Sequence, residues 1–88
     1  MTNTNIGLFI NRLKQLSGKE VYIWIKHKLF GTQKISCVFN PIDNDERLGF
    51  SINGEAKYIL KAKLLDCGCK DNRYFMADDL MRIEVETA

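Results

Sequence analysis

Aromatic and basic side chains alternate over one short stretch of the sequence. Tyr22, Trp24, Lys26 and Lys28 occupy every second position. Side chains two residues apart leave a strand on the same face. Rings interleaved with ammonium groups can stack on bases and neutralise phosphates, as in many binders of single-stranded nucleic acids. The spacing therefore predicts a candidate binding face.

Three lysines further along the chain, Lys57, Lys61 and Lys63, would extend this positive surface if their strand lies beside the first. Two other interpretations stay open for the aromatic face. An amphipathic helix could cover Tyr22 and Trp24 as a second small core, which would leave the lysines solvated. The rings could also form a protein–protein interface, where Tyr and Trp are enriched.

The cysteines offer a second, weaker kind of site. Cys67 and Cys69 could supply two zinc ligands, with Cys37 or His27 completing the set. Structural zinc sites usually place at least two residues between paired thiolates, and the sequence has no second pair. The pattern favours two turn cysteines without a metal, and His27 is expected to pack within its strand.

Catalysis finds little support in the residue types. The sequence has one histidine, no phosphate-binding glycine loop, and no serine or cysteine beside a recognisable base. Asp43, Asp45 and Glu46 alternate as in calcium loops, but the glycine and distal glutamate of such loops are missing. We expect no enzyme activity and no cofactor.

Length and composition indicate one small globular domain over residues 1–88. The net charge is +2 and the pI is near 8.5, which is too mild to indicate nucleic-acid binding by itself. The odd cysteine count does not form a disulfide framework, and no apolar run reaches the roughly 18 residues of a membrane span. We therefore expect a reduced, cytoplasmic protein with no membrane partner.

The element that must position the candidate face is the stretch Glu20–Phe30. Its period of two predicts a half-buried strand. The residues expected on its core face alternate with the aromatic and basic ones: Val21, Ile23, Ile25, His27 and Leu29.

An amphipathic helix is predicted before it, over about residues 4–16. Apolar residues recur there at helical spacing, Thr4 or Asn5 can cap its start, and Gly18 is a natural left-handed stop. We expect this helix to lie across one open end or face of the sheet.

The remaining chain alternates like short strands joined by turns. Asn53-Gly54 is a strong type I′ hairpin signal, and Asp78-Asp79 is expected to start a tight turn. Residues 40–46 are predicted to form an acidic loop and residues 67–72 a turn. The predicted strands cover approximately residues 19–29, 33–39, 47–53, 55–66, 73–77 and 80–86.

The predicted strand 55–66 is long enough to require a bend or bulge. Its core face is predicted to carry Ala56, Tyr58, Leu60, Ala62 and Leu64, with the lysines, Ile59 and Leu65 on the other face. Helix is the competing prediction for residues 56–65, because Ala, Lys and Leu favour it. One helix followed by five or six short antiparallel strands predicts a mainly β protein, a small closed or nearly closed barrel.

Two segments resemble the small-barrel superfamily of Sm-like and SH3-like domains. Residues 10–25, INRLKQLSGKEVYIWI, are similar to the helix and first strand of Sm-like proteins. Residues 73–85, RYFMADDLMRIEV, are similar to the closing strand–turn–strand of both groups. The resemblance implies a small barrel. RNA-binding Sm-like proteins carry a glycine in the penultimate hairpin, and residues 76–83 have none, so the resemblance extends to the fold alone.

Two functions remain as predictions. The first is a non-catalytic interaction or assembly module that acts through protein contacts and can form a homo-oligomer. The alternative is a single-stranded nucleic-acid binder that uses the aromatic–lysine face. The mild net charge and the hydrophobic residues among the lysines of 55–66 favour the first.

Overall fold

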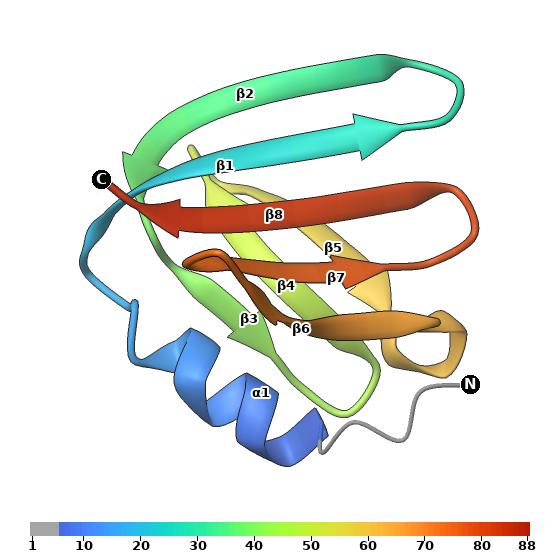
Figure 1. Ribbon diagram of the computed structural model, residues 1–88, viewed down its shortest axis with the longest axis horizontal. Coiled ribbons are helices and arrows are strands. Elements are labelled where there is room, and N and C mark those ends of the chain that lie inside the picture. The colour runs from blue at the N-terminus through green and yellow to red at the C-terminus, as the bar shows by residue number, and fades with distance from the viewer. Residues whose placement is uncertain (1–5) are drawn as a thin grey trace.

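The computed structural model describes residues 6–88, in which strands predominate and one α-helix precedes them (Figure 1). Residues 4 and 5, where the helix and its cap were predicted to begin, lie outside this range. The elements in chain order are α1 (Ile6–Lys14), β1 (Glu20–His27), β2 (Gly31–Val38), β3 (Pro41–Asp43), β4 (Arg47–Ile52), β5 (Glu55–Leu60), the 3₁₀ turn η1 (Lys61–Lys63), β6 (Asp66–Lys70), β7 (Arg73–Ala77) and β8 (Met81–Thr87).

Five strands form one antiparallel sheet in the order β2-β1-β8-β7-β6. The alternation that predicted β1 is confirmed, because Val21, Ile23 and Ile25 are buried and the residues between them face outward. Ile23 pairs with Ile35 on one side and with Val85 on the other. β1 therefore lies inside the sheet and presents one face to the core.

The other three strands form a second antiparallel sheet in the order β3-β4-β5. The hairpin between β4 and β5 turns at Asn53 and Gly54, as predicted, with φ values of 52° and 80°. Asp78 also acts as predicted: its carboxylate accepts the backbone N–H groups of Leu80 and Met81 and turns β7 into β8.

The chain passes between the two sheets twice. Phe39 and Asn40 carry it from β2 to β3, and η1 carries it from β5 to β6. Over residues 6–88 no closed barrel is found, because the strands form two separate hydrogen-bonded sheets. Backbone hydrogen bonds at the corners, such as Phe39 N–H to the Lys19 carbonyl oxygen (2.9 Å), stabilise the bends.

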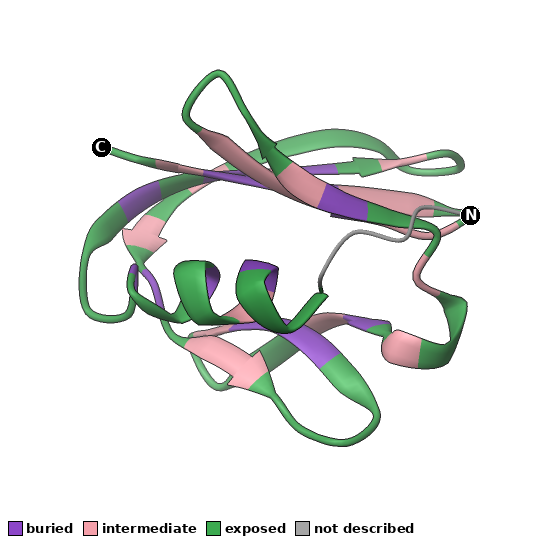
Figure 2. Cartoon of the chain, turned by 60° about the horizontal axis from the view of Figure 1, so that its bottom comes forward, coloured by how far each residue is buried: buried purple, intermediate pink, exposed green. Residues whose placement is uncertain are grey.

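Helix α1 lies across the gap between the sheets and packs nearest to β3 and β6 (Figure 2). Phe9 and Leu13 are its buried residues. The chain leaves the helix through Gly18, whose φ of 80° and N–H bond to the Phe39 carbonyl oxygen confirm the predicted stop. Within residues 6–88 no helix is long and apolar enough to span a membrane.

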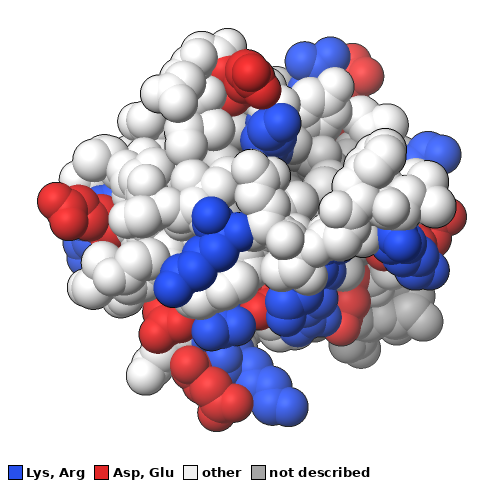
Figure 3. All heavy atoms as spheres, turned by 90° about the horizontal axis from the view of Figure 1, so that it is seen from above, with Lys and Arg blue, Asp and Glu red and all other residues white. Residues whose placement is uncertain are grey.

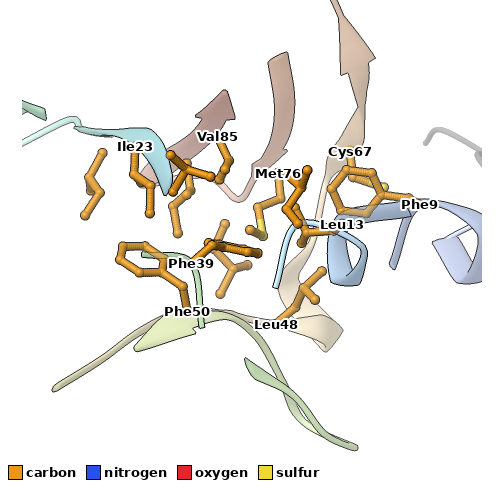
Figure 4. Close-up of a cluster of buried hydrophobic side chains, with 14 residues drawn as sticks. Phe9, Leu13, Ile23, Phe39, Leu48, Phe50, Cys67, Met76 and Val85 are labelled. Carbon is orange, nitrogen blue, oxygen red and sulfur yellow. The ribbon is translucent and has the colours of Figure 1, made fainter. Parts of the chain in front are cut away.

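One hydrophobic core is shared by the helix and both sheets. Figure 4 shows Phe39 and Phe50 between the sheets, with Leu13 pointing towards Met76 from the helix. Phe39, Phe50 and Leu13 have essentially no solvent exposure. This shared core explains why the helix is needed, since it fills the space that the sheets leave open.

Three predictions for the middle of the chain are wrong in part. The strand predicted over 55–66 ends at Leu60, and η1 redirects the chain to the other sheet. The turn predicted at 67–72 is mostly strand β6, and the loop predicted at 40–46 contains strand β3. Pro41 has no backbone N–H group, but it can begin β3 because β3 is an edge strand, in which a residue can lack this donor.

The faces of β5 were also assigned wrongly. Ile59 is buried and pairs with the buried Leu48, and Lys57, two residues earlier, pairs with the buried Phe50 and so lies on the same inward side. Tyr58 and Leu60 point away from the core. The pairing with β4 decides which side of β5 faces the core. Alternation in the sequence separates the two sides of the strand but does not show which of them faces inward.

Candidate functional site

The predicted aromatic face lies on the side of the five-stranded sheet that points away from the core, here called the outer face. Tyr22, Trp24 and Lys26 all belong to it. Helix α1 packs on the opposite side, so the interpretation in which it covers these rings is wrong. Lys28 lies beyond the end of β1, in the exposed turn, where its backbone N–H binds the Leu80 carbonyl oxygen.

At the centre of the outer face lies Glu84, which the sequence analysis did not single out. It is only 5% exposed. Its carboxylate accepts hydrogen bonds from Lys26 (3.1 Å), Arg73 (2.8 Å) and Arg82 (2.6 Å). Three strands thus contribute cations to one carboxylate. The signal that could have identified it is its cross-strand position opposite Trp24, which becomes visible only with the register.

These three cations stabilise the ionised form of Glu84. Burial alone would raise the pKa of the carboxyl group, but hydrogen bonds from Arg82, Arg73 and Lys26 outweigh burial and lower the pKa from 4.5 to about 2. Glu84 is therefore ionised at neutral pH and neutralises part of the positive charge that the lysine pattern indicated.

The rings of the outer face already carry cations of the chain itself. The guanidinium of Arg73 lies 3.7 Å from the ring centroid of Trp24, and that of Arg82 lies 4.3 Å from Phe75. The ammonium of Lys34 lies 4.7 Å from the centroid of Tyr22. These are cation–π distances. A nucleic-acid base that stacked on the same face of Trp24 or Phe75 would have to displace a guanidinium that is also bound to Glu84.

A hollow of about 500 Å³ lies beside this network. Its lining mixes both signs of charge, so it has no strong preference for an anion. The lining residues are Lys26, Lys70, Asp71, Arg73, Phe75, Arg82, Glu84 and Glu86.

The other predicted lysines do not join the outer face. Lys57 lies on β5 in the three-stranded sheet, and Lys61 and Lys63 lie in η1. Lys61 instead binds Asp43 of β3 (2.6 Å), which also contacts Lys14 of α1 (3.5 Å). Because the chain changes sheets at η1, the predicted continuous surface of seven residues is divided.

Asp43 links helix, strand and 3₁₀ turn, and its loss should be measurable. The hydrogen bond from Lys61 is the main reason why the pKa of Asp43 is lowered. We expect Asp43→Asn to lower the free energy of unfolding by about 0.5–1 kcal/mol, since the pair is only partly shielded from water. Urea unfolding of this variant, of Lys61→Met and of the double variant measures the coupling. Additive losses would contradict the linkage.

The cysteines are not assembled into one site. Cys37 lies on β2 and the other two on β6, at opposite edges of the five-stranded sheet. In residues 6–88 no group of three or more His, Cys, Asp or Glu side chains could hold a metal ion. His27 accepts the N–H groups of Leu29 (3.0 Å) and Phe30 (3.3 Å) at Nδ1, so it orders the following turn.

That turn begins a surface that the sequence analysis missed. Leu29 was assigned to the core face of β1, but the strand ends at His27, and Leu29 and Phe30 are 75% and 85% exposed. Phe30 stacks on the ring of His27 at a centroid distance of 4.6 Å. These two residues lead directly into edge strand β2. Residues 29–38 are called the exposed segment below.

Fold and site together define a small two-sheet β protein with an exposed apolar tip. Comparison with protein-family models, with curated proteins and with solved structures finds no match.

Proposed function

We propose that this protein is a non-catalytic assembly module that acts through protein contacts, including contacts between its own copies. The observation that carries the proposal is the exposed segment. Within residues 6–88, Leu29 and Phe30 are the most exposed large hydrophobic side chains, and they adjoin a strand whose outer edge has no backbone partner. Protein contacts would cover both features.

The energetics favour such contacts. Burying one leucine or phenylalanine side chain contributes roughly 1.5–3 kcal/mol. Phe30 is already held by the ring and Nδ1 of His27, so less conformational freedom is lost when it docks. His27, the single histidine of the sequence, is used for this turn, which supports a structural and not a catalytic role.

Nucleic-acid binding by the outer face is less well supported. Arg73, Arg82 and Lys26 are all bound to Glu84, and two of the rings lie under guanidinium groups. To bind phosphate groups, these three cations would first have to break their hydrogen bonds to Glu84.

The relation to small barrels belongs to the same proposal. β1 pairs with β2, β3 with β4, β4 with β5, β6 with β7 and β7 with β8, and the last strand returns to pair with β1. The strands therefore follow a cyclic order, with the chain changing sheets between β2 and β3 and between β5 and β6. This order supports descent from a small barrel of the Sm-like or SH3-like kind that is opened at these two corners.

Sedimentation velocity over a range of concentrations tests the proposed function. We expect self-association that changes little between low and moderate salt, because the exposed segment contains one charged residue, Lys34. The double variant Leu29→Ser/Phe30→Ser should weaken it at least about tenfold, as expected when two exposed apolar side chains no longer contribute.

Leu65→Ser is the matched control, because Leu65 is 55% exposed and lies outside the exposed segment. A protein that stays monomeric at all concentrations, or one that loses association equally in both variants, would contradict the proposal. Quenching of Trp24 fluorescence by single-stranded oligonucleotides at low salt would instead support the nucleic-acid alternative.

A further inference from the structure

Strand β2 is the outermost strand of the five-stranded sheet, and its free edge is regular. It pairs with β1 over eight consecutive residues without a bulge. Within residues 6–88 its backbone makes no backbone hydrogen bond besides this ladder, and only the Asn40 side chain approaches it, at the Val38 carbonyl oxygen (3.5 Å). Every second residue therefore presents an N–H and a C=O group to solvent, which an added strand can pair.

The other sheet edges are better protected. β3 has three residues and begins with Pro41, and α1 packs beside both β3 and β6. β5 has six residues against the eight of β2, and it carries two charges, Glu55 and Lys57. In contrast, β2 contains no proline and a single charge, Lys34. Figure 3 views the molecule from the β2 side: charged residues of both signs gather most densely along the lower rim, and fewer charged groups, set among uncharged atoms, lie above them.

We infer that β2 pairs antiparallel with β2 of a second copy, which joins two five-stranded sheets into one sheet of ten strands. The inference rests on the proposed function and names the contact that performs it. Water can solvate these backbone groups one at a time, whereas an added extended strand pairs the whole array at once, and an identical strand matches it through a two-fold axis. The outer faces of the two copies then continue into each other.

The charge of Lys34 selects the register. Two registers pair seven of the eight residues of β2: one uses residues 31–37 of each copy and the other uses 32–38. The first places Lys34 directly opposite Lys34 of the partner subunit, and directly opposed like charges are destabilising. The second places Lys34 opposite the partner's Ser36, and Ile35 opposite the partner's Ile35. We therefore assign the second register.

This register also covers apolar residues that are partly or wholly exposed in the single chain. Thr32 lies opposite the partner's Val38, a residue that is 48% exposed in the single chain. The turn with Leu29 and Phe30 comes two residues before Thr32, so each tip lies at an end of the shared ladder. Ile35, half-buried in the single chain, is covered by its symmetry mate.

Charge substitutions at Ser36 test the register without touching the core, because Ser36 is exposed. Ser36→Lys places two lysine pairs across the interface and should weaken the dimer about fivefold or more. Ser36→Glu places a carboxylate opposite each partner Lys34 and should strengthen it by a similar factor. The difference between the variants should shrink as salt is raised. Circular dichroism of both variants checks that the fold is retained.

Disulfide trapping gives a second measurement. In the assigned register Gln33 lies opposite the partner's Cys37, within the Cα separation that a disulfide bridges. Gln33→Cys with oxidised glutathione as the oxidant should give a covalent dimer linked from residue 33 to residue 37, as peptide mapping would show. Gln33→Cys/Cys37→Ser should not give this link.

Lys34→Cys in a Cys37→Ser background is the register control, because it forms a 34-to-34 disulfide only in the rejected register. That product, or an oligomer that ignores both Ser36 variants while losing association in Leu29→Ser/Phe30→Ser, would overturn the inference and leave the proposed function standing. A strictly monomeric protein would overturn both.

Discussion

Replacing Gly49 by alanine should destabilise the protein by about 3 kcal/mol or more, at or beyond the usual upper end for overpacking. Gly49 lies in β4 opposite Tyr58. A Cβ atom there would overlap the carbonyl oxygen of Lys57 and lie 2.6 Å from the Cα of Tyr58. These are backbone atoms of the paired strand, so they cannot rotate away. The strands would have to separate, although Leu48 and Phe50 on either side are buried.

Thermal and urea unfolding followed by circular dichroism measures this loss, and Gly68→Ala is the matched control. Gly68 also lies within a strand, but its added Cβ would meet only the Phe75 ring, at 3.3 Å. A ring can tilt by a few tenths of an ångström, so we expect a loss below about 1 kcal/mol. Equal losses in the two variants would show that the close backbone approach in β4 and β5 does not decide the stability.

Local signals in the sequence predicted the elements whose structure is locally determined. The predicted alternation of β1 is confirmed. Successive side chains leave a strand on opposite faces whatever lies beside it, so the residue types along β1 are enough to predict its two faces. Asn53-Gly54 and Gly18 adopt positive φ, as their residue types indicate. The Asp78 carboxylate accepts the N–H groups of Leu80 and Met81, two and three residues further along, which requires no distant partner.

Features that depend on pairing were missed. Lys57 reads as a solvent-facing residue, but β4 turns that side of β5 inward. Cys67 and Gly68 read as a turn, yet Phe75 of β7 lies beside Gly68 and the segment continues as a strand. The exposed tip was missed for a related reason, because alternation continues through Leu29 although the ladder ends at His27.

The outer face shows the limit of reading charges one strand at a time. On β1 alone, Trp24 and Lys26 indicate an aromatic and positive face. The register places Glu84 beside both and places Arg73 over the indole. Most of the cation–aromatic pattern is thereby used within the sheet, and this is why the exposed segment, and not the outer face, carries the proposed function.

Glu84→Gln should produce the second large effect, a loss of about 2–3 kcal/mol at neutral pH. The carboxylate is 5% exposed and binds three cations, and removing one member of a shielded ionic cluster leaves the others uncompensated. The lowered pKa, from 4.5 to about 2, corresponds to roughly 3 kcal/mol. We place the expected loss slightly lower because Lys26, Arg73 and Arg82 are partly exposed and screened by water.

The pH dependence gives this prediction its sign. A carboxyl group whose pKa is lower in the folded chain stabilises the fold above its ordinary pKa, and this stabilisation is lost as the pH falls through the folded value. The difference between the protein and Glu84→Gln should therefore be constant near pH 7 and shrink between about pH 4.5 and 2. Glu86→Gln is the control, because Glu86 is more exposed and, among the described residues, has one ionic partner, Arg73 (3.2 Å), so we expect a loss below about 1 kcal/mol. If the difference in free energy of unfolding between the protein and Glu84→Gln stayed unchanged down to pH 2, the prediction would be contradicted. The loss would then come from the shape or hydrogen bonding of the glutamine amide and not from the missing charge.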